Sequence, residues 1–173
     1  MNTLLFTRDG TWTLRDLKVA DAPRVLAVLR DTAQGLQKRG LAQWSIFLTG
    51  GEDLVARRFR EGSVYLVERG GQDAGIMVVQ LADPFWEAQG ADDQALWVHS
   101  LAVRPVFAKR GLGKALLAFA ESLARAKGKG ALRLDVIDSN AKLKAYYAAL
   151  GFSPLGVKPH EGEFIRLLEK TLR

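Results

Sequence analysis

Residues 101–114 read Leu-Ala-Val-Arg-Pro-Val-Phe-Ala-Lys-Arg-Gly-Leu-Gly-Lys, and this stretch decides the fold. It starts as the end of an apolar strand, passes through a turn of small and basic residues, and enters a helix near Gly111. The unpaired N–H groups of a first helical turn attract anions, and Gly111 and Gly113 let a ligand approach the backbone closely. Lys109, Arg110 and Lys114 add positive charge. The stretch therefore predicts a phosphate-binding strand–turn–helix.

Two familiar nucleotide-binding loops do not fit this turn. A P-loop needs glycine at position 108 and serine or threonine after the lysine, where this chain has Ala108 and Ala115. A dinucleotide-binding turn needs a third glycine at the position of Leu116. The phosphate is therefore expected to belong to a different class of ligand.

Outward from this turn, the hydrophobic periodicity predicts alternating strands and helices. Strands are predicted over residues 11–17, 63–69, 74–81, 95–103, 132–137, 155–157 and 164–168. Helices are predicted after Asp21 and over residues 33–39, 53–60, 111–128 and 140–150. Residues 83–93 are expected to form a loop. This order predicts one mixed α/β domain covering residues 1–173.

Local signals mark the ends of several of these elements. Asp21 followed by Pro23 is typical of a helix start, and Gly40 is expected to stop the helical stretch before it. Gly70-Gly71-Gln72-Asp73 between two β-rich runs is typical of a hairpin. Gly151 directly follows the last predicted helix, as a C-terminal cap would.

Composition narrows the classes of function. The 173 residues include no cysteine and two histidines, which excludes disulfides, a cysteine nucleophile and a histidine-rich metal cluster, so no metal is expected. No apolar run approaches the ~18 residues of a membrane-spanning helix. Arg8 and Asp9 interrupt the segment where a signal peptide would be apolar. We therefore expect a cytoplasmic protein without a membrane partner.

The net charge of +6 leaves an anionic partner open. However, the 25 basic residues are interleaved with 19 acidic ones and form no basic stripe of the kind that favours a nucleic-acid backbone. A basic nucleic-acid-binding module is therefore a weak alternative.

Residues 108–113 resemble the coenzyme A signature R/Q-x-x-G-x-G/A of the GNAT superfamily of N-acetyltransferases, except that Ala108 replaces Arg or Gln. The flanking residues 101–105 and 114–117 resemble the strand end and the helix start of that family. The resemblance implies that N–H groups of the turn hold the pyrophosphate, while Leu101 and Val103 pair with pantetheine and a strand N–H near Leu101 or Ala102 stabilises the oxyanion. The implied cofactor-binding residues are Leu101, Ala102, Val103, Lys109, Arg110, Gly111, Leu112, Gly113, Lys114, Asn140 and Tyr147.

A second segment, N-(x)6-Y-(x)3-G-F from Asn140 to Phe152, resembles the family's other motif. That resemblance implies that Tyr147 protonates the departing thiolate and that Asn140 contacts the cofactor, with Tyr146 as the alternative acid. The residues alone also allow a packed aromatic at Tyr147 and a simple helix cap at Asn140.

The group that accepts the amine's proton is left open by the residues. His99 lies in the middle of a predicted strand and is a candidate base or substrate contact, although a structural role is the alternative. Glu87, Asp92 and Asp93 in the preceding loop are rival candidates.

Aromatic residues of the early helices and loops are candidate walls of an acceptor pocket, because the family builds its acceptor sites there. They are Trp44, Phe47, Phe85 and Trp86. Core packing is the alternative for at least half of them.

As a whole, the resemblance implies a three-layer α/β (α+β) fold with a central mixed, mostly antiparallel sheet of about seven strands, flanked by helices and splayed at one parallel pair. It implies direct transfer of acetyl from acetyl-coenzyme A to a primary amine of a small molecule or peptide, without an acyl-enzyme. A non-catalytic acyl-coenzyme A binder or sensor is the alternative. Dimers are common in this family, so a homodimer also stays open.

Overall fold

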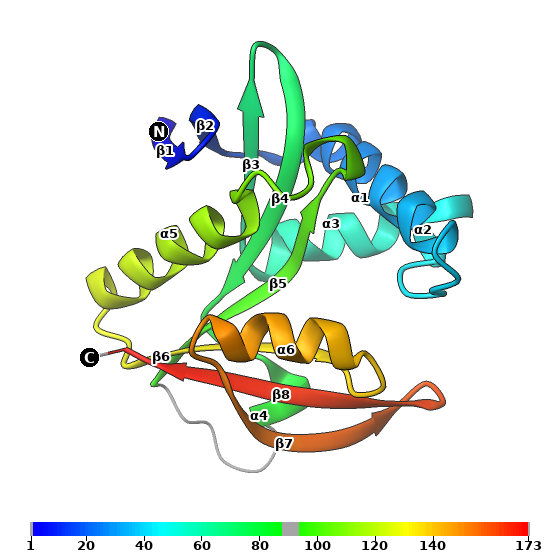
Figure 1. Ribbon diagram of the computed structural model, residues 1–173, viewed down its shortest axis with the longest axis vertical. Coiled ribbons are helices and arrows are strands. Elements are labelled where there is room, and N and C mark those ends of the chain that lie inside the picture. The colour runs from blue at the N-terminus through cyan, green and yellow to red at the C-terminus, as the bar shows by residue number, and fades with distance from the viewer. Residues whose placement is uncertain (1, 88–93, 173) are drawn as a thin grey trace. The chain divides into compact units, whose positions relative to one another are not determined.

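The structure is a computed structural model that describes residues 2–87 and 94–172, which form two compact units (Figure 1). Unit 1 comprises residues 1–79 and 100–117, and unit 2 comprises residues 80–99 and 118–173. The strands are β1 (Asn2–Thr7), β2 (Gly10–Asp16), β3 (Ser63–Arg69), β4 (Gln72–Gln80), β5 (Ala95–Val103), β6 (Ala131–Ile137), β7 (Ser153–His160) and β8 (Glu163–Thr171). The helices are α1 (Ala22–Gln37), α2 (Ile46–Thr49), α3 (Glu52–Glu61), α4 (Pro84–Glu87), α5 (Leu112–Ala126), α6 (Ala141–Ala149) and the 3-10 turns η1 (Val19–Asp21) and η2 (Pro105–Phe107). Within the described ranges, none of these helices combines the length and the apolar character of a bilayer-crossing segment.

The strands form an open sheet in the order β1-β2-β3-β4-β5-β6-β8-β7. The β1–β2, β2–β3, β3–β4, β6–β8 and β7–β8 pairs are antiparallel. β5 and β6 are parallel and pair from Ala95 opposite Ala131 to Trp97 opposite Arg133. β5 then continues for six more residues to Val103. The predicted mixed, mostly antiparallel sheet flanked by helices is therefore confirmed, with eight strands rather than about seven.

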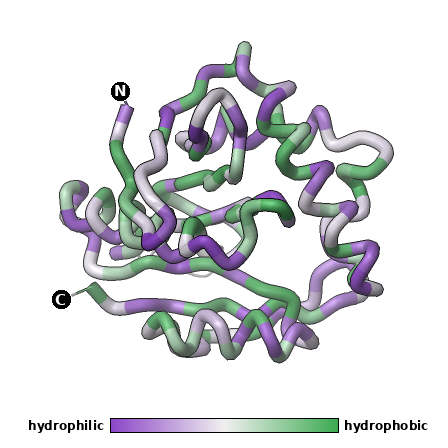
Figure 2. Tube along the Cα trace, turned by 45° about the horizontal axis from the view of Figure 1, so that its top comes forward, coloured by the Kyte–Doolittle hydropathy of each residue, from purple (hydrophilic) through white to green (hydrophobic). Residues whose placement is uncertain are grey.

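In unit 1, α1, α2 and α3 pack on the strands through one apolar core (Figure 1). Figure 2 shows hydrophobic and hydrophilic residues alternating along the helical turns, as expected for helices that bury a single face. Each large aliphatic side chain buried in this way stabilises the fold by about 1.5–3 kcal/mol. The buried members of the core are Leu17, Val25, Val28, Leu29, Ala33, Phe47, Val55, Val64, Leu66, Ile76, Val78 and Ala102.

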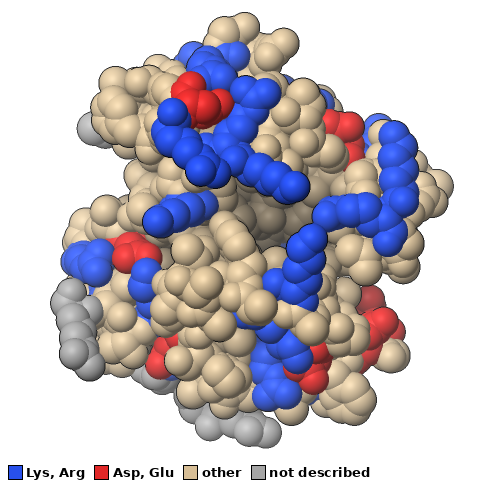
Figure 3. Space-filling model, viewed as in Figure 1, with Lys and Arg blue, Asp and Glu red and all other residues tan. Residues whose placement is uncertain are grey.

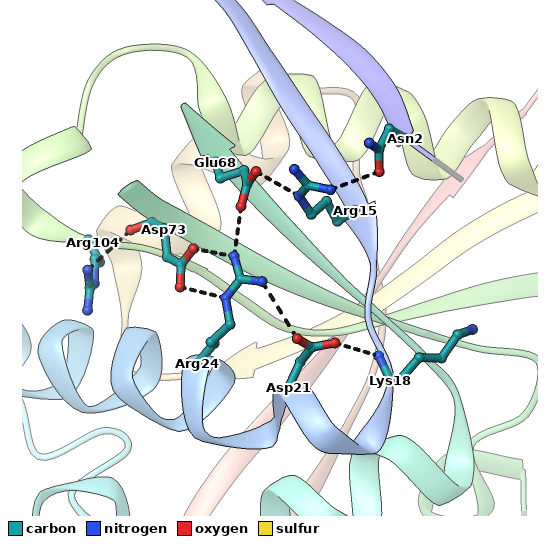
Figure 4. A network of polar contacts seen from close by, with 8 residues as sticks. All are labelled: Asn2, Arg15, Lys18, Asp21, Arg24, Glu68, Asp73 and Arg104. Atoms are coloured by element: carbon teal, nitrogen blue, oxygen red, sulfur yellow. Dashed lines mark hydrogen bonds and ion pairs between the residues drawn. The ribbon is translucent and has the colours of Figure 1, made fainter. Parts of the chain in front are cut away.

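A polar network fastens the start of α1 to the β3–β4 hairpin (Figure 4). Arg24 Nη2 donates to Glu68 at 2.7 Å and to Asp73 at 2.6 Å. Asp21 occupies the N-cap position of α1, as predicted, but its carboxylate accepts the N–H of Lys18 at 3.0 Å and makes no capping bond to the helix. Arg24 therefore holds α1 in place by charge-assisted bonds to side chains that lie far along the sequence.

Unit 2 combines β6, β8 and β7 with α6, which Figure 1 shows in orange beside the red β8. The Asp138 carboxylate accepts from Lys144 Nζ at 3.1 Å and from Arg166 Nε at 2.9 Å, so it connects α6 with β8. Gly151 follows α6 with φ of +92°, which confirms the predicted glycine cap.

The prediction for the N-terminus was wrong, because β1 precedes the strand expected to be first. In β1, Leu5 is buried while Leu4 and Phe6 are 56% and 74% exposed. An edge strand with apolar residues on both faces lacks the polar–apolar alternation that identifies strands in a sequence. By contrast, the predicted hairpin is confirmed, although its turn is shorter than the expected residues 70–73: it consists of Gly70 and Gly71, with φ of +58° and +76°, and β4 begins at Gln72.

Three helix predictions also need correction. The separate helix expected over residues 33–39 is the last part of α1, which passes through Gly35 without a break. A Cβ on Gly35 would lie 2.5 Å from Pro105 Cγ, so this glycine serves close packing. The short α2 was not predicted, and α4 occupies the start of the expected loop, whose residues 88–93 lie outside the described part.

We expect Gly75→Ala to destabilise the protein, because β4 and β5 approach each other closely at Gly75. An added Cβ would lie 2.6 Å from the carbonyl oxygen of Ala102 and 3.3 Å from Val67 Cγ1. Overpacking of this kind typically lowers the free energy of unfolding by about 1–3 kcal/mol, which urea denaturation can measure. Gly130→Ala is the matched control, since its Cβ would meet only Gln94 Oε1, at 3.9 Å. Equal stabilities of the two variants would contradict the expectation.

Candidate active site

The predicted phosphate turn lies in unit 1 between η2 and α5. Lys109 and Gly111 have φ of +63° and +84°, and the first helical bond runs from the Ala115 N–H to the Gly111 carbonyl at 3.0 Å. Left-handed residues alternating with ordinary ones turn successive N–H groups toward one side, which is a common anion-binding arrangement. Glycine suits position 111, whereas Lys109 holds a conformation that is strained for a non-glycine residue.

The backbone N–H groups of residues 109–114 donate to no acceptor in the part of the chain that the structure describes. They include the N–H groups of Leu112, Gly113 and Lys114 in the first turn of α5, which have no intrahelical acceptor. This run of free donors is the geometry that the sequence predicted for a phosphate site.

The basic side chains around the turn differ in their surroundings. Arg110 Nη1 lies 3.2 Å from Asp9 Oδ2, and Arg69 Nη2 is 3.4 Å from the same oxygen. Lys109 and Lys114 are exposed and form no ion pair with any described residue. Figure 3 shows Lys and Arg side chains gathered on this face of unit 1, with an acidic group among them. Of the three predicted cations, Arg110 is thus already paired.

Asp9 lies in the β1–β2 turn and is strongly stabilised as a carboxylate. A 2.6 Å hydrogen bond from Thr7 Oγ1 is the largest cause, and bonds from Trp12 and Arg110 with the charge of Arg69 add to it against the effect of burial. Together they lower the pKa of Asp9 to about 2. The carboxylate is therefore ionised at any physiological pH.

β5 supplies the predicted backbone groups of Leu101, Ala102 and Val103. At Ser100 φ is +48°, so the alternation of side chains that a regular strand would show is interrupted there. Beyond it, Ala102 belongs to the core of unit 1. The Arg104 N–H then donates to the Ala74 carbonyl at 2.8 Å. The strand end is therefore held against β4 as it enters the phosphate turn.

Tyr147 lies on α6 in unit 2 and is 6% exposed. Its ring packs edge-on against Phe152 and Tyr146 at centroid distances of 5.5 Å and 5.3 Å. Its hydroxyl has no hydrogen-bond partner among the described residues. Burial, and secondarily the charges of Tyr146 and Asp135, raise the pKa of Tyr147 well above its usual value, so the phenol stays protonated.

The packed-aromatic interpretation of Tyr147 and the capping interpretation of Asn140 are both confirmed. Asn140 Oδ1 accepts the N–H of Leu143 at 3.0 Å at the start of α6. Because the cap involves only the amide oxygen, the side-chain NH₂ is left for another partner. The cofactor roles that the resemblance implies for these residues stay predictions.

His99 lies in the unit 2 part of β5, where its Nε2 is 3.3 Å from Asp83 Oδ2. Nε2 is buried, and the orientation of the contact falls short of a hydrogen bond. Of the rival bases, Glu87 belongs to α4, while Asp92 and Asp93 lie outside the described residues.

The four aromatic candidates for a pocket wall occupy two places. In unit 1, Phe47 is a core residue and Trp44 packs against that core, so the packing interpretation is confirmed for this pair. In unit 2, Phe85 is 36% exposed and Trp86 Nε1 donates to Asp135 Oδ2 at 2.8 Å. Only Phe85 presents much of its ring to solvent.

The predicted site residues therefore divide between the two units. Unit 1 contains residues 101–103 and 109–114, and unit 2 contains His99, Asn140 and Tyr147. Within unit 1 the strand end and the turn are continuous in sequence, which brings every predicted backbone donor into one segment.

Comparison with known proteins identifies the family. A sequence model of the acetyltransferase (GNAT) family matches residues 33–152, a range that includes the phosphate turn, His99 and Tyr147. The chain belongs to the acetyltransferase (GNAT) family. The uncharacterized N-acetyltransferase YesJ of Bacillus subtilis is 28% identical over 142 residues, which cover 79% of this chain and 78% of that protein.

Solved structures agree with this placement. A GNAT-family acetyltransferase from Listeria monocytogenes has a TM-score of 0.80 and 27% identity, covering 98% of this chain and 100% of its own. The PaiA N-acetyltransferase of Thermoplasma acidophilum, in complex with coenzyme A, shares the fold with a TM-score of 0.70 at 16% identity, covering 92% and 98% of the two chains. The prediction of an acetyltransferase is confirmed at the level of this family.

Sequence reasoning missed three residues that contact or adjoin predicted site residues in one unit or the other. Asp9 lies outside the family match, and its partner Arg110 is 101 residues away. β5 is irregular at Ser100, where φ is positive, and no glycine at that position signals this in the sequence. Asp83 could have been found, because an Asp-Pro pair before an aromatic residue is typical of a helix start, which is where it lies.

We expect Asp9→Asn to lower the melting temperature above about pH 5, with a difference from the wild type that shrinks as the pH falls toward 2. Because the folded-state pKa of Asp9 is about 2 and the unfolded value is about 3.9, its charge stabilises the fold above pH ~4 and loses that effect as the pH falls through the folded pKa. Calorimetry between pH 7 and pH 2 measures the effect. Asp53→Asn removes an exposed carboxylate of the same unit as a control. A difference that does not depend on pH would refute the assignment.

Proposed function

We propose that this GNAT protein transfers the acetyl group of acetyl-coenzyme A directly to a primary amine of a small molecule or peptide. The observation that carries the proposal is the run of unsatisfied N–H groups over residues 109–114 at the start of α5. A pyrophosphate offers several anionic oxygens to such a run, and the helix dipole adds to the attraction. Membership of the family and the coenzyme A complex of PaiA support the choice of cofactor.

β5 and the turn would bind different parts of the cofactor. Backbone groups of Leu101 and Val103 would pair with the pantetheine amides as an added strand does, and the turn would hold the pyrophosphate. An N–H near Leu101 or Ala102 would then donate to the thioester oxygen as it becomes an oxyanion. Lys109 and Lys114, which are exposed, would add charge next to the phosphates.

The reaction needs one proton acceptor and one proton donor. The neutral amine attacks the thioester carbon, a C–N bond forms, the C–S bond breaks, and the amine loses a proton. His99 would take that proton and the Tyr147 phenol would give one to the leaving thiolate. Burial keeps Tyr147 protonated, and its hydroxyl has no partner among the residues described, so both observations fit a donor to a bound ligand. We also propose that residues 1–173 act as one domain, since the family match includes parts of both units.

We expect Gly111→Asp to weaken coenzyme A binding by at least about tenfold relative to Gly111→Asn. Both residues tolerate the φ of +84° and have nearly the same shape, so only the carboxylate facing the phosphate differs. Isothermal titration calorimetry with coenzyme A gives the two dissociation constants. Equal affinities of the two variants would show that the pyrophosphate does not lie against this turn.

Release of free thiol from acetyl-coenzyme A, screened over a panel of amines, tests the transfer itself. Binding without thiol release for any amine would instead support the non-catalytic acyl-coenzyme A binder. Retention on DNA or RNA that falls steeply with added salt, without coenzyme A binding, would favour the nucleic-acid module.

We expect Tyr147→Phe to lower kcat by about 10²-fold while the melting temperature stays near the wild-type value. The loss follows from removing the acid, and the fold is spared because the hydroxyl bonds to no described residue. Tyr146→Phe is the matched control and should keep kcat within threefold, since Tyr146 is 42% exposed and adjacent to Tyr147. A larger loss from Tyr146→Phe than from Tyr147→Phe would transfer the acid role to Tyr146.

A further inference from the structure

Asp83 is a buried carboxylate at the start of α4 and is 7% exposed. Its Oδ1 accepts the N–H of Phe85 at 2.9 Å, and its carbonyl accepts the N–H of Trp86 at 3.0 Å. These bonds fix the carboxylate on the backbone of the short helix, so its second oxygen, Oδ2, is held in one direction. That oxygen faces His99.

The contact between Asp83 and His99 is enclosed. Oδ2 lies 3.3 Å from Nε2, and both side chains are 9% exposed. The imidazole lies nearly parallel to the Trp97 ring, with an interplanar angle of 10° and a centroid distance of 6.4 Å. Nδ1 has no hydrogen-bond partner among the described residues. One ring nitrogen therefore faces a fixed carboxylate, while the other is unpartnered.

We propose that Asp83 is a positioning residue for His99: it orients the imidazole and stabilises the imidazolium that forms when His99 accepts the amine's proton. The inference rests on the proposed function. A proton on Nε2, the nitrogen that lies 3.3 Å from Asp83 Oδ2, leaves the lone pair of Nδ1 as the acceptor of the neutral ring. The amine nitrogen then loses its proton to Nδ1 as the C–N bond forms, and the resulting cation lies beside a carboxylate that stays ionised. Asp83 itself gains no proton.

Other charged groups near this pair already have partners. Arg133 lies 5.5 Å from the Trp97 ring and bonds Glu169 at 2.8 Å. Asp135, which lies on β6 as Arg133 does, accepts the indole N–H of Trp86 at 2.8 Å. Asp83 is accordingly the carboxylate that the described structure places against the His99 ring. Although burial opposes its ionisation, the contact with His99 and the N–H groups of Phe85 and Trp86 outweigh burial and lower the pKa of Asp83.

A purely structural role is the competing interpretation, because Asp83 also caps α4. Asp83→Asn separates the two roles. Asparagine keeps an oxygen that can accept the Phe85 N–H and is as good a cap as aspartate, but it removes the negative charge beside the imidazole. Glu163→Gln removes an exposed charge from the same unit and controls for net charge.

The test measures thiol release against pH for the wild type, Asp83→Asn, His99→Gln, the double variant and Glu163→Gln, using an amine that the wild type accepts. We expect Asp83→Asn to lower kcat at least tenfold, to leave KM for acetyl-coenzyme A within twofold, and to move the acidic limb of the profile to lower pH. In the His99→Gln background the same change should have little further effect, since the two residues act as a unit. Glu163→Gln should match the wild type.

Two outcomes would overturn the inference. Asp83→Asn with wild-type kcat and pH profile excludes the role, and so does a loss of the same size with and without His99, which indicates structural damage alone. In either case the wild type is active, so the proposed function stands. Absence of thiol release from the wild type with every amine would instead refute the proposed function itself.

Discussion

β5 has a different neighbour at each end, and this constraint fixes the backbone that leads into the turn at residues 109–114. Its first residues, Ala95 to Trp97, run parallel to β6, whereas its last ones approach β4 so closely that Gly75 has no space for a Cβ. Between them, Ser100 takes a left-handed conformation that costs about 1–3 kcal/mol for a non-glycine residue. Strain of this size persists only where packing on both sides over-determines it. The strand end is thus held firmly as it enters residues 109–114, whose six N–H groups donate to no acceptor in the described ranges.

The cations around that turn differ in one respect: the two arginines, Arg69 and Arg110, are ion-paired in the described structure, whereas Lys109 and Lys114 are not. Asp9 pairs with both Arg110 and Arg69, and its single negative charge offsets one of their two positive charges. A phosphate that recruits Arg110 must therefore compete with a carboxylate that is hard to protonate, and it gains less from that side chain than from an unpaired one. Backbone N–H groups face no such competition, because nothing in the described chain accepts from them. This difference argues that the turn recognises its anion mainly through the backbone, with Lys109 and Lys114 adding charge from outside.

Local signals explain which parts of this arrangement could be predicted from the sequence. The two-glycine hairpin at residues 70–71, the glycine cap at 151 and the strand–turn–helix at 101–114 each depend on neighbouring residues, and the structure confirms their conformation. β1 was missed because an edge strand need not alternate. Asp9 contacts Arg110, which lies 101 positions along the sequence, and Asp83 contacts His99, which lies 16 positions along it. No hydrophobic periodicity encodes such pairs. These residues come together only when the chain folds, so patterns among neighbouring residues do not reveal the contacts.

In unit 2, one kind of environment produces opposite protonation states in two buried groups. Tyr147 is buried without a hydrogen bond from the described residues, so desolvation prevails and the phenol keeps its proton. Asp83 is buried as well, but backbone N–H groups and His99 outweigh desolvation, and its carboxylate stays charged. In the proposed reaction, Tyr147 would therefore already hold the proton that the leaving thiolate needs, and the charge of Asp83 would lie beside the imidazole that takes the proton of the amine.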